Sequence, residues 1–177
     1  AGISKGDHVA IWATNVPEWI QLLFATAKIG AVLVTVNTAY KVFELEYLLR
    51  QSDCKALVMI EGYKDSDYVQ IVNELCPTLK DCKPGSYNNP MLPFLKTIIY
   101  AGDRECPAGM LPWGQLEEMG KIIPQKMFDD ITSNLDPHEI VNMQYTSGTT
   151  GFPKGVMLSH YNIVNNGLMI GDRLKFT

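Results

Sequence analysis

One stretch of this chain brings together the groups that bind a polyphosphate. Residues 145–156 read Tyr-Thr-Ser-Gly-Thr-Thr-Gly-Phe-Pro-Lys-Gly-Val. Hydroxyl side chains, backbone N–H groups freed by two glycines, and a nearby lysine are ligands for a nucleotide triphosphate. The sequence therefore predicts a phosphate-binding loop over residues 146–154. Its members are Thr146, Ser147, Gly148, Thr149, Thr150, Gly151, Phe152, Pro153 and Lys154.

This stretch has two other interpretations, a solvated turn and a Walker A loop. Clusters of Gly, Ser and Thr are commonly plain solvated turns, but the lysine and the strand patterns on both sides favour phosphate binding. A Walker A loop reads G-x-x-x-x-G-K-[ST] and joins a strand to a helix. Here no Ser or Thr follows Lys154, and the alternating pattern at 140–145 and the apolar run at 156–158 predict flanking strands. We therefore predict a strand–loop–strand hairpin and reject a Walker A site.

Several segments together resemble the adenylate-forming superfamily, which includes acyl-CoA synthetases, adenylation domains of peptide synthetases and luciferases. The loop looks like the phosphate-binding signature of that superfamily. The motif Ser-His-Tyr-Asn-Ile over residues 159–163 is closest to the medium- and long-chain fatty acyl-CoA synthetases. The resemblance extends over nearly all 177 residues, and its other segments are Lys-Gly-Asp-His-Val-Ala-Ile (5–11), Asn-Val-Pro-Glu-Trp (15–19), Ala-Lys-Ile-Gly-Ala-Val (27–32) and Glu-Leu-Glu-Tyr-Leu-Leu (44–49).

The resemblance implies an ATP-dependent acyl-CoA ligase that activates a fatty carboxylate as acyl-AMP and transfers it to coenzyme A. It implies ATP, Mg²⁺ and coenzyme A as ligands, and assigns the β- and γ-phosphates to the loop amides, Ser147, Thr149, Thr150 and Lys154. Thr146 matches the threonine that helps to hold Mg²⁺, and Lys154 would stabilise phosphate charge during catalysis. Two alternatives stay open: adenylation of an aryl or amino acid, and a noncatalytic fragment that keeps the loop as structure.

Other parts of the family pattern cannot be placed in this sequence. They are the adenine-binding Tyr-Gly-x-Thr-Glu motif, a ribose-binding aspartate, a hinge, and a small domain with the main catalytic lysine. We therefore expect residues 1–177 to be a partial N-terminal AMP-binding domain that is inactive alone and packs against the remaining part of the same polypeptide. An exposed apolar surface would favour this interpretation, and a closed polar one a free-standing domain. A homodimer of the protein is a second assembly that the sequence leaves open.

Composition narrows the class of protein. Hydrophobic residues make up 46% and charged residues 19%, which is typical of a globular domain. The net charge of −4 gives no sign of the basic surface that binds nucleic acid, so nucleic acid is not expected as a partner. The longest apolar run, residues 31–36, is far shorter than the ~20 residues of a membrane span, so no transmembrane segment is expected. Four cysteines without C-x-x-C or metal spacing indicate free thiols in the cytoplasm, or in the mitochondrial matrix of a eukaryote.

The elements that must position the loop alternate between strands and helices. A capping box at Asn15 and Glu18 and a C′ glycine at Gly30 would delimit the first helix. This order predicts an α/β fold with a mainly parallel sheet covered by helices. Trp12, Trp19 and Phe24 are predicted core residues. The expected strands are 8–13, 31–36, 56–60 and 95–101; the expected helices are 15–30, 42–50, 67–75, one or two within 113–133 interrupted at Pro124, and 161–173; an irregular connection covers 77–94.

Overall fold

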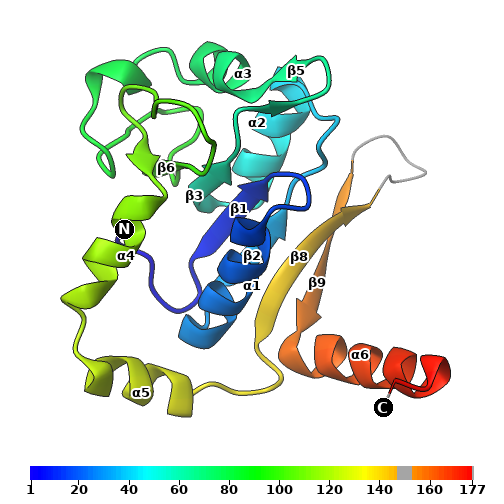
Figure 1. Ribbon diagram of the computed structural model, residues 1–177. Helices are drawn as coiled ribbons and strands as arrows, with labels where there is room; N and C mark the ends of the chain where they lie inside the picture. Colours follow the sequence, from blue (N-terminus) through cyan, green and yellow to red (C-terminus); the bar gives the residue numbers. More distant parts are fainter. Residues whose placement is uncertain (147–152, 177) are drawn as a thin grey trace.

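The computed structural model describes residues 1–146 and 153–176 and is built around a seven-stranded sheet (Figure 1). The strand order is β7-β6-β3-β1-β2-β8-β9, and every pairing is parallel except β8 with β9. The prediction of a mainly parallel α/β sheet is confirmed. The strands are β1 (His8–Trp12), β2 (Val32–Thr35), β3 (Cys54–Met59), β6 (Thr97–Tyr100), β7 (Leu111–Pro112), β8 (Ile140–Thr146) and β9 (Lys154–Ser159).

Six α-helices of the described residues surround this sheet, and β4 (Gly62–Tyr63) pairs with β5 (Ser66–Asp67) in a small separate ribbon. Helix α1 packs on β2 and α5, and α2 packs on α3. No helix within residues 1–146 and 153–176 is long and apolar enough to cross a bilayer. The helices are α1 (Pro17–Ile29), α2 (Val42–Gln51), α3 (Tyr68–Leu75), α4 (Gly114–Lys121), α5 (Gln125–Ser133) and α6 (His160–Leu174).

The core lies between the central strands and their helices, and it fixes the segment that leads into α2. Because parallel strands are covered on both faces, β1, β2 and β3 are almost entirely buried and apolar. Trp12 stacks on Tyr68 with ring centroids 3.6 Å apart. The Trp12 indole N–H donates to the carbonyl of Asn37 at 3.1 Å, and the Tyr68 hydroxyl donates to that of Thr38 at 2.8 Å. Two buried aromatic residues thus anchor the connection from β2 to α2.

Helix α1 confirms one predicted boundary and corrects the other. It ends at Gly30, which has a φ of 70°, and a Cβ there would lie 2.7 Å from Leu135 Cδ2. Its N-cap is Val16, with no side-chain hydrogen bond, so the capping box predicted at Asn15 and Glu18 is wrong. Pro17 occupies the first helical position instead, where its lack of a backbone N–H costs no hydrogen bond.

One of the three predicted core aromatics does not lie in the core. Trp12 is fully buried and Trp19 packs partly against the core, but Phe24 is 61% exposed. The buried positions of α1 are Leu22 and Thr26. Phe24 is two residues from each of them and therefore points to the opposite side of the helix. Aromatic type alone was the wrong signal here.

Residues 77–94 carry little regular structure. They contain the short 3₁₀ helix η1 (Leu79–Asp81) and one isolated bridge between Asn89 and Leu92. Leu79, Tyr87 and Leu92 are nevertheless buried. Three apolar anchors therefore hold this irregular segment against the β3–β6 side of the molecule, remote from β8 and β9.

Candidate functional site

The predicted loop is carried by an antiparallel hairpin at one edge of the sheet (Figure 1). Strand β8 pairs in parallel with β2, for example Thr35 with Gln144, and β9 pairs antiparallel with β8. The strands predicted on both sides of the loop are confirmed. Thr146, the last residue of β8, lies opposite Lys154, the first residue of β9, and both are exposed.

The structure places three of the nine predicted loop residues. Thr146, Pro153 and Lys154 are described, and opposite residues of an antiparallel pair have Cβ atoms roughly 5 Å apart. The ladder therefore brings one hydroxyl and one ammonium group to the two ends of the loop. The remaining predicted residues, Ser147, Gly148, Thr149, Thr150, Gly151 and Phe152, lie outside the described residues.

Helix α2 contacts the loop end of the hairpin at two points. The Tyr47 hydroxyl donates to the carbonyl of Pro153 at 3.4 Å. The Tyr145 hydroxyl, from β8, donates to Oε1 of Gln51. Burial raises the pKa of Tyr145 to about 12, an effect that nearby Cys54 adds to. Tyr145 is therefore a protonated donor throughout the physiological pH range.

The absence of a side chain at Gly155 leaves room for the side chains of Met143 and Tyr145. A Cβ at this position would lie 3.1 Å from Sδ of Met143 and 3.3 Å from Cζ of Tyr145. The Tyr145 ring thus lies beside the backbone of Gly155, its partner in the ladder. The roles of Tyr47 and Gln51 could not be predicted from the sequence. Their contacts join α2 to a hairpin about 100 residues later, and such contacts leave no local pattern. The one sequence signal in α2 was the resemblance of residues 44–49 to the adenylate-forming superfamily.

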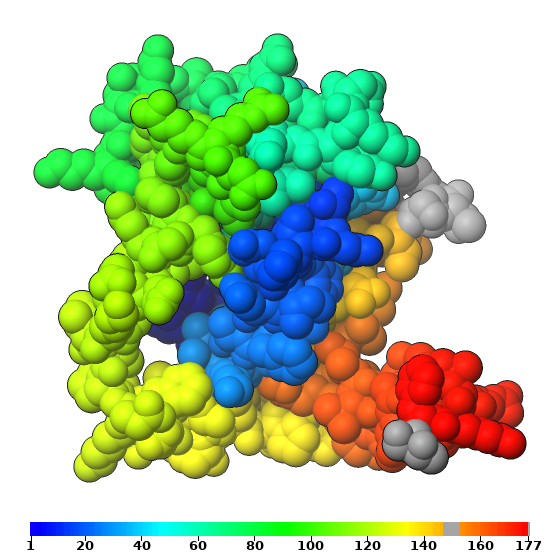
Figure 2. All heavy atoms as spheres, in the orientation of Figure 1, coloured from blue at the N-terminus to red at the C-terminus, as the bar shows by residue number. Residues whose placement is uncertain are grey.

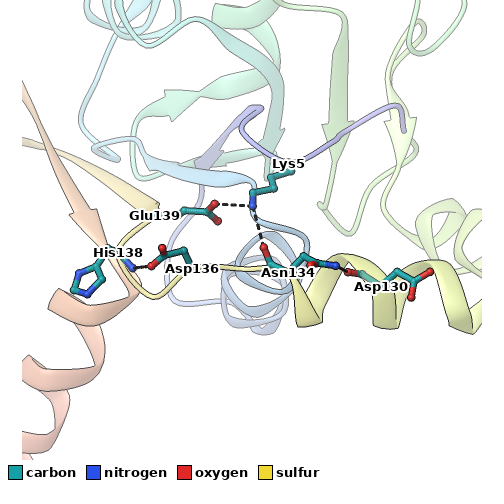
Figure 3. A network of polar contacts seen from close by, with 6 residues as sticks. All are labelled: Lys5, Asp130, Asn134, Asp136, His138 and Glu139. Atoms are coloured by element: carbon teal, nitrogen blue, oxygen red, sulfur yellow. Dashed lines mark hydrogen bonds and ion pairs between the residues drawn. The ribbon is translucent and has the colours of Figure 1, made fainter.

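A second set of polar contacts lies at the opposite end of β8 (Figure 3). Lys5 Nζ lies 2.6 Å from Oε1 of Glu139 and donates to the carbonyl of Asn134 at 3.2 Å. The hydrogen bond from Lys5 lowers the pKa of Glu139. Asn134 in turn donates to the carbonyl of Asp130, and the His138 N–H donates to Asp136. These contacts hold the N-terminal segment against the connection that leads into β8.

A groove of about 630 Å³ lies beside the hairpin and is open to solvent. Asn142, on β8, is buried; its Nδ2 donates to the carbonyl of Leu33 at 3.0 Å, while its Oδ1 has no partner among the described atoms. The groove is thus a mixed surface of carboxamides and apolar side chains. Its lining residues are Trp19, Leu23, Asn142, Gln144, Met157, Leu158, Asn162, Ile163 and Asn166.

Helix α6 follows the hairpin directly and exposes a broad apolar surface. Ser159 caps it, since its Oγ accepts from the Asn162 N–H at 3.2 Å. None of the residues of α6 is buried, and Figure 2 shows the helix projecting at the lower right. We call the following residues the α6 apolar surface: Tyr161, Ile163, Val164, Leu168, Met169, Ile170 and Leu174.

The cysteines and acidic residues do not form a second reactive centre in the part of the chain that the structure describes. That part contains no group of three or more His, Cys, Asp or Glu residues that could hold a metal ion. All four cysteines are free, and burial raises the pKa of Cys54 to about 12 and also raises that of Cys76 and Cys106. The thiols of Cys54, Cys76 and Cys106 are therefore poor nucleophiles, because the thiolate is the reactive form.

Comparison with known proteins decides the family. The family described as AMP-binding enzyme matches residues 1–176. The chain belongs to this family. YngI of Bacillus subtilis (strain 168), named as a candidate acyl-CoA synthetase, is 51% identical over 176 residues, which is 99% of this chain and 32% of YngI. The human mitochondrial medium-chain acyl-CoA ligase ACSF2 is 40% identical, over 98% of this chain and 28% of ACSF2.

Solved structures agree on the fold. A candidate long-chain fatty acid–CoA ligase from Rhodopseudomonas palustris CGA009 superposes with a TM-score of 0.68 at 23% identity, covering 99% of this chain and 37% of that one. The chain therefore has the fold of acyl-CoA ligase N-terminal regions. It spans less than a third of the length of YngI or ACSF2. The resemblance drawn from the sequence is confirmed.

Proposed function

We propose that this chain forms the front part of the large domain of an ATP-dependent acyl-CoA ligase. In this proposal the enzyme activates a fatty carboxylate as acyl-AMP and transfers the acyl group to coenzyme A. Residues 1–177 are a partial N-terminal AMP-binding domain with its phosphate loop at 146–154 and an irregular connection at 77–94. The observation that carries the proposal is the pairing of Thr146 with Lys154 at the mouth of the signature loop.

The chemistry asks for positioning and charge neutralisation. A carboxylate is already ionised at neutral pH, so its attack on the α-phosphorus of ATP needs no general base. The protein must hold the oxygens in line and neutralise charge as pyrophosphate leaves. Lys154 is exposed at the first position of β9, where its ammonium group can reach phosphates held by the loop. We assign it to the β- and γ-phosphates, together with the loop hydroxyls and amides.

Thr146 fits the role of a magnesium ligand. Mg²⁺ prefers oxygen ligands and is commonly held by a few protein groups, waters and substrate phosphates. The exposed hydroxyl-bearing side chain of Thr146 stands across the ladder from Lys154, at the end of β8. Bound Mg²⁺ would neutralise phosphate charge. In this arrangement Thr146 supplies one oxygen and Lys154 a separate cation.

Two observations support a fatty acid as the acid substrate and a larger enzyme as the context. ACSF2, 40% identical to this chain, is named a medium-chain acyl-CoA ligase. The α6 apolar surface exposes seven apolar side chains on a helix with no buried residue, which favours a partner segment over a free-standing noncatalytic domain. We propose that the remaining part of the same polypeptide covers it. The free thiols suit a reducing compartment such as the cytoplasm or the mitochondrial matrix.

The test is ATP–pyrophosphate exchange by the intact protein with a panel of fatty, aryl and amino acids. We expect exchange with fatty acids and a loss of about ten- to hundredfold in Lys154→Ala, the range of one charge-assisted contact. The thermal midpoint should not change, because Lys154 is exposed. Lys126→Ala, an exposed lysine on α5, is the matched control and should exchange normally. Unchanged exchange in Lys154→Ala would refute the assigned role.

A further inference from the structure

We infer that one face of α2 positions the loop end of the β8–β9 hairpin, with Tyr47 and Gln51 as positioning residues for Lys154. The inference rests on the function proposed for the hairpin. It adds residues that lie about 100 positions before the loop and outside its signature. Neither residue would contact the reacting atoms, so both act through the strand that carries Lys154.

The contacts reach both strands of the hairpin from a single helix face. Tyr47 and Gln51 are four residues apart on α2 and therefore point the same way. Tyr47 donates to the carbonyl of Pro153, the residue that precedes Lys154 on β9. Gln51 accepts from the hydroxyl of Tyr145, which is on β8. Each strand is thus attached to α2 within one residue of the Thr146–Lys154 pair.

Helix α2 is a firm support for this attachment. Its opposite face buries Leu45, Leu48 and Leu49 in the core. Its C-terminal end is fastened by Ser52, whose hydroxyl donates to the carbonyl of Leu48 at 2.6 Å. A helix fixed in the core can therefore transmit its position to residues that bind it from outside.

The hairpin needs such support because β9 is an edge strand. Within residues 1–146 and 153–176, strand β9 pairs with β8 alone, and Lys154, Val156 and Met157 are all exposed. A lysine ammonium lies at the end of a flexible four-carbon stem. If the backbone at its base also moves, more conformational entropy is lost when phosphate binds. Fixing Pro153 and Tyr145 against α2 reduces that loss.

The test uses Tyr47→Phe in the intact protein, because this change keeps the ring and removes the hydroxyl. We expect the KM for MgATP to rise about two- to tenfold, the range expected for one hydrogen bond. The KM for the acid and the thermal midpoint should stay at their wild-type values. Tyr63→Phe, on β4, is the control for loss of a tyrosine hydroxyl elsewhere and should leave both constants unchanged. Gln51→Ala, at an exposed position, should reproduce the MgATP effect independently of the Tyr47 ring.

A double-mutant cycle separates positioning from a general structural effect. If Tyr47 acts through Lys154, Tyr47→Phe should add little to the loss already seen in Lys154→Ala. Additive losses, or a wild-type KM for MgATP in both Tyr47→Phe and Gln51→Ala, would overturn the inference while Lys154→Ala still supports the proposed function. Full activity in Lys154→Ala would instead overturn the proposed function itself.

Discussion

Thr146 and Lys154 have little buried surface, so their value lies in where the ladder places them rather than in stability. Their neighbours Tyr145 and Gly155 form the next pair of the ladder, and there the packing is tight. The ring of Tyr145 occupies the space that a side chain at residue 155 would need. At the scale of single residues, the hairpin therefore combines an exposed chemical pair with a crowded supporting pair.

Gly155→Ala tests this crowding. The added methyl group would lie 3.1 Å from Met143 Sδ and 3.3 Å from Tyr145 Cζ, so both side chains must shift by a few tenths of an ångström. We expect a destabilisation of about 1 kcal/mol, at the lower end of overpacking costs because Met143 is flexible. The thermal midpoint of the intact protein measures it. Gly120→Ala, where a Cβ meets nothing within 4 Å, should be neutral or stabilising. Equal effects of the two changes would contradict the prediction.

The elements show which parts of the fold the sequence could predict. Strands β1, β2 and β3 were recognisable because burial on both faces demands continuous apolar runs. Gly30 marked the end of α1 and Pro124 separated α4 from α5, because the backbone preferences of glycine and proline are local. The start of α1 and the exposure of Phe24 were mispredicted, since capping geometry and helix rotation depend on tertiary packing. The chemistry of the loop was recognisable from its residues, but the support from Tyr47 and Gln51 was not, because it crosses the chain.

The junction before β8 includes the ion pair between Lys5 and Glu139, and the strength of this contact varies with pH. The hydrogen bond from Lys5 lowers the pKa of Glu139 below 4.5, so this contact stabilises the folded state above that pH and is lost as the pH falls through the lowered value. We expect Glu139→Gln to lower the thermal midpoint slightly at pH 7, and the difference from wild type to shrink and vanish as the pH falls through the lowered pKa of Glu139.

Thermal melts of both proteins between pH 3.5 and 7.5 provide the measurement. Glu118→Gln, in the exposed pair with Lys121 on α4, controls for loss of a surface carboxylate and should leave the midpoint nearly unchanged at pH 7. A difference for Glu139→Gln that grows toward acid would show that the ion pair with Lys5 is not its source.

The whole molecule has two unequal sides. Leu79, Tyr87 and Leu95 are buried on the β7–β3 side, whereas α6, next to β9, has no buried residue and exposes apolar side chains along its whole length. On α6, Ile163, Val164, Leu168, Ile170 and Leu174 fall on one broad side of the helix, and Asn162 and Asn166 lie on the other. An amphipathic helix with its apolar stripe unburied needs a second surface to cover it. The surface proposed above to cover it is the remaining part of the same polypeptide.

Leu168→Glu tests where the α6 apolar surface lies in the intact protein. Leu168 is 62% exposed here, so a charge would cost little if the surface stays open to water. If the remaining polypeptide covers it, we expect a destabilisation of about 2 kcal/mol or more, because a buried unpaired carboxylate is strongly unfavourable. Asn166→Glu, at an exposed position two residues from Leu168 and therefore on the other side of the helix, should leave the thermal midpoint nearly unchanged. A midpoint loss that depends on protein concentration, accompanied by dissociation in sedimentation, would instead assign the surface to a homodimer. Equal midpoints for the two variants would show that α6 remains exposed and would remove this support for the larger ligase domain.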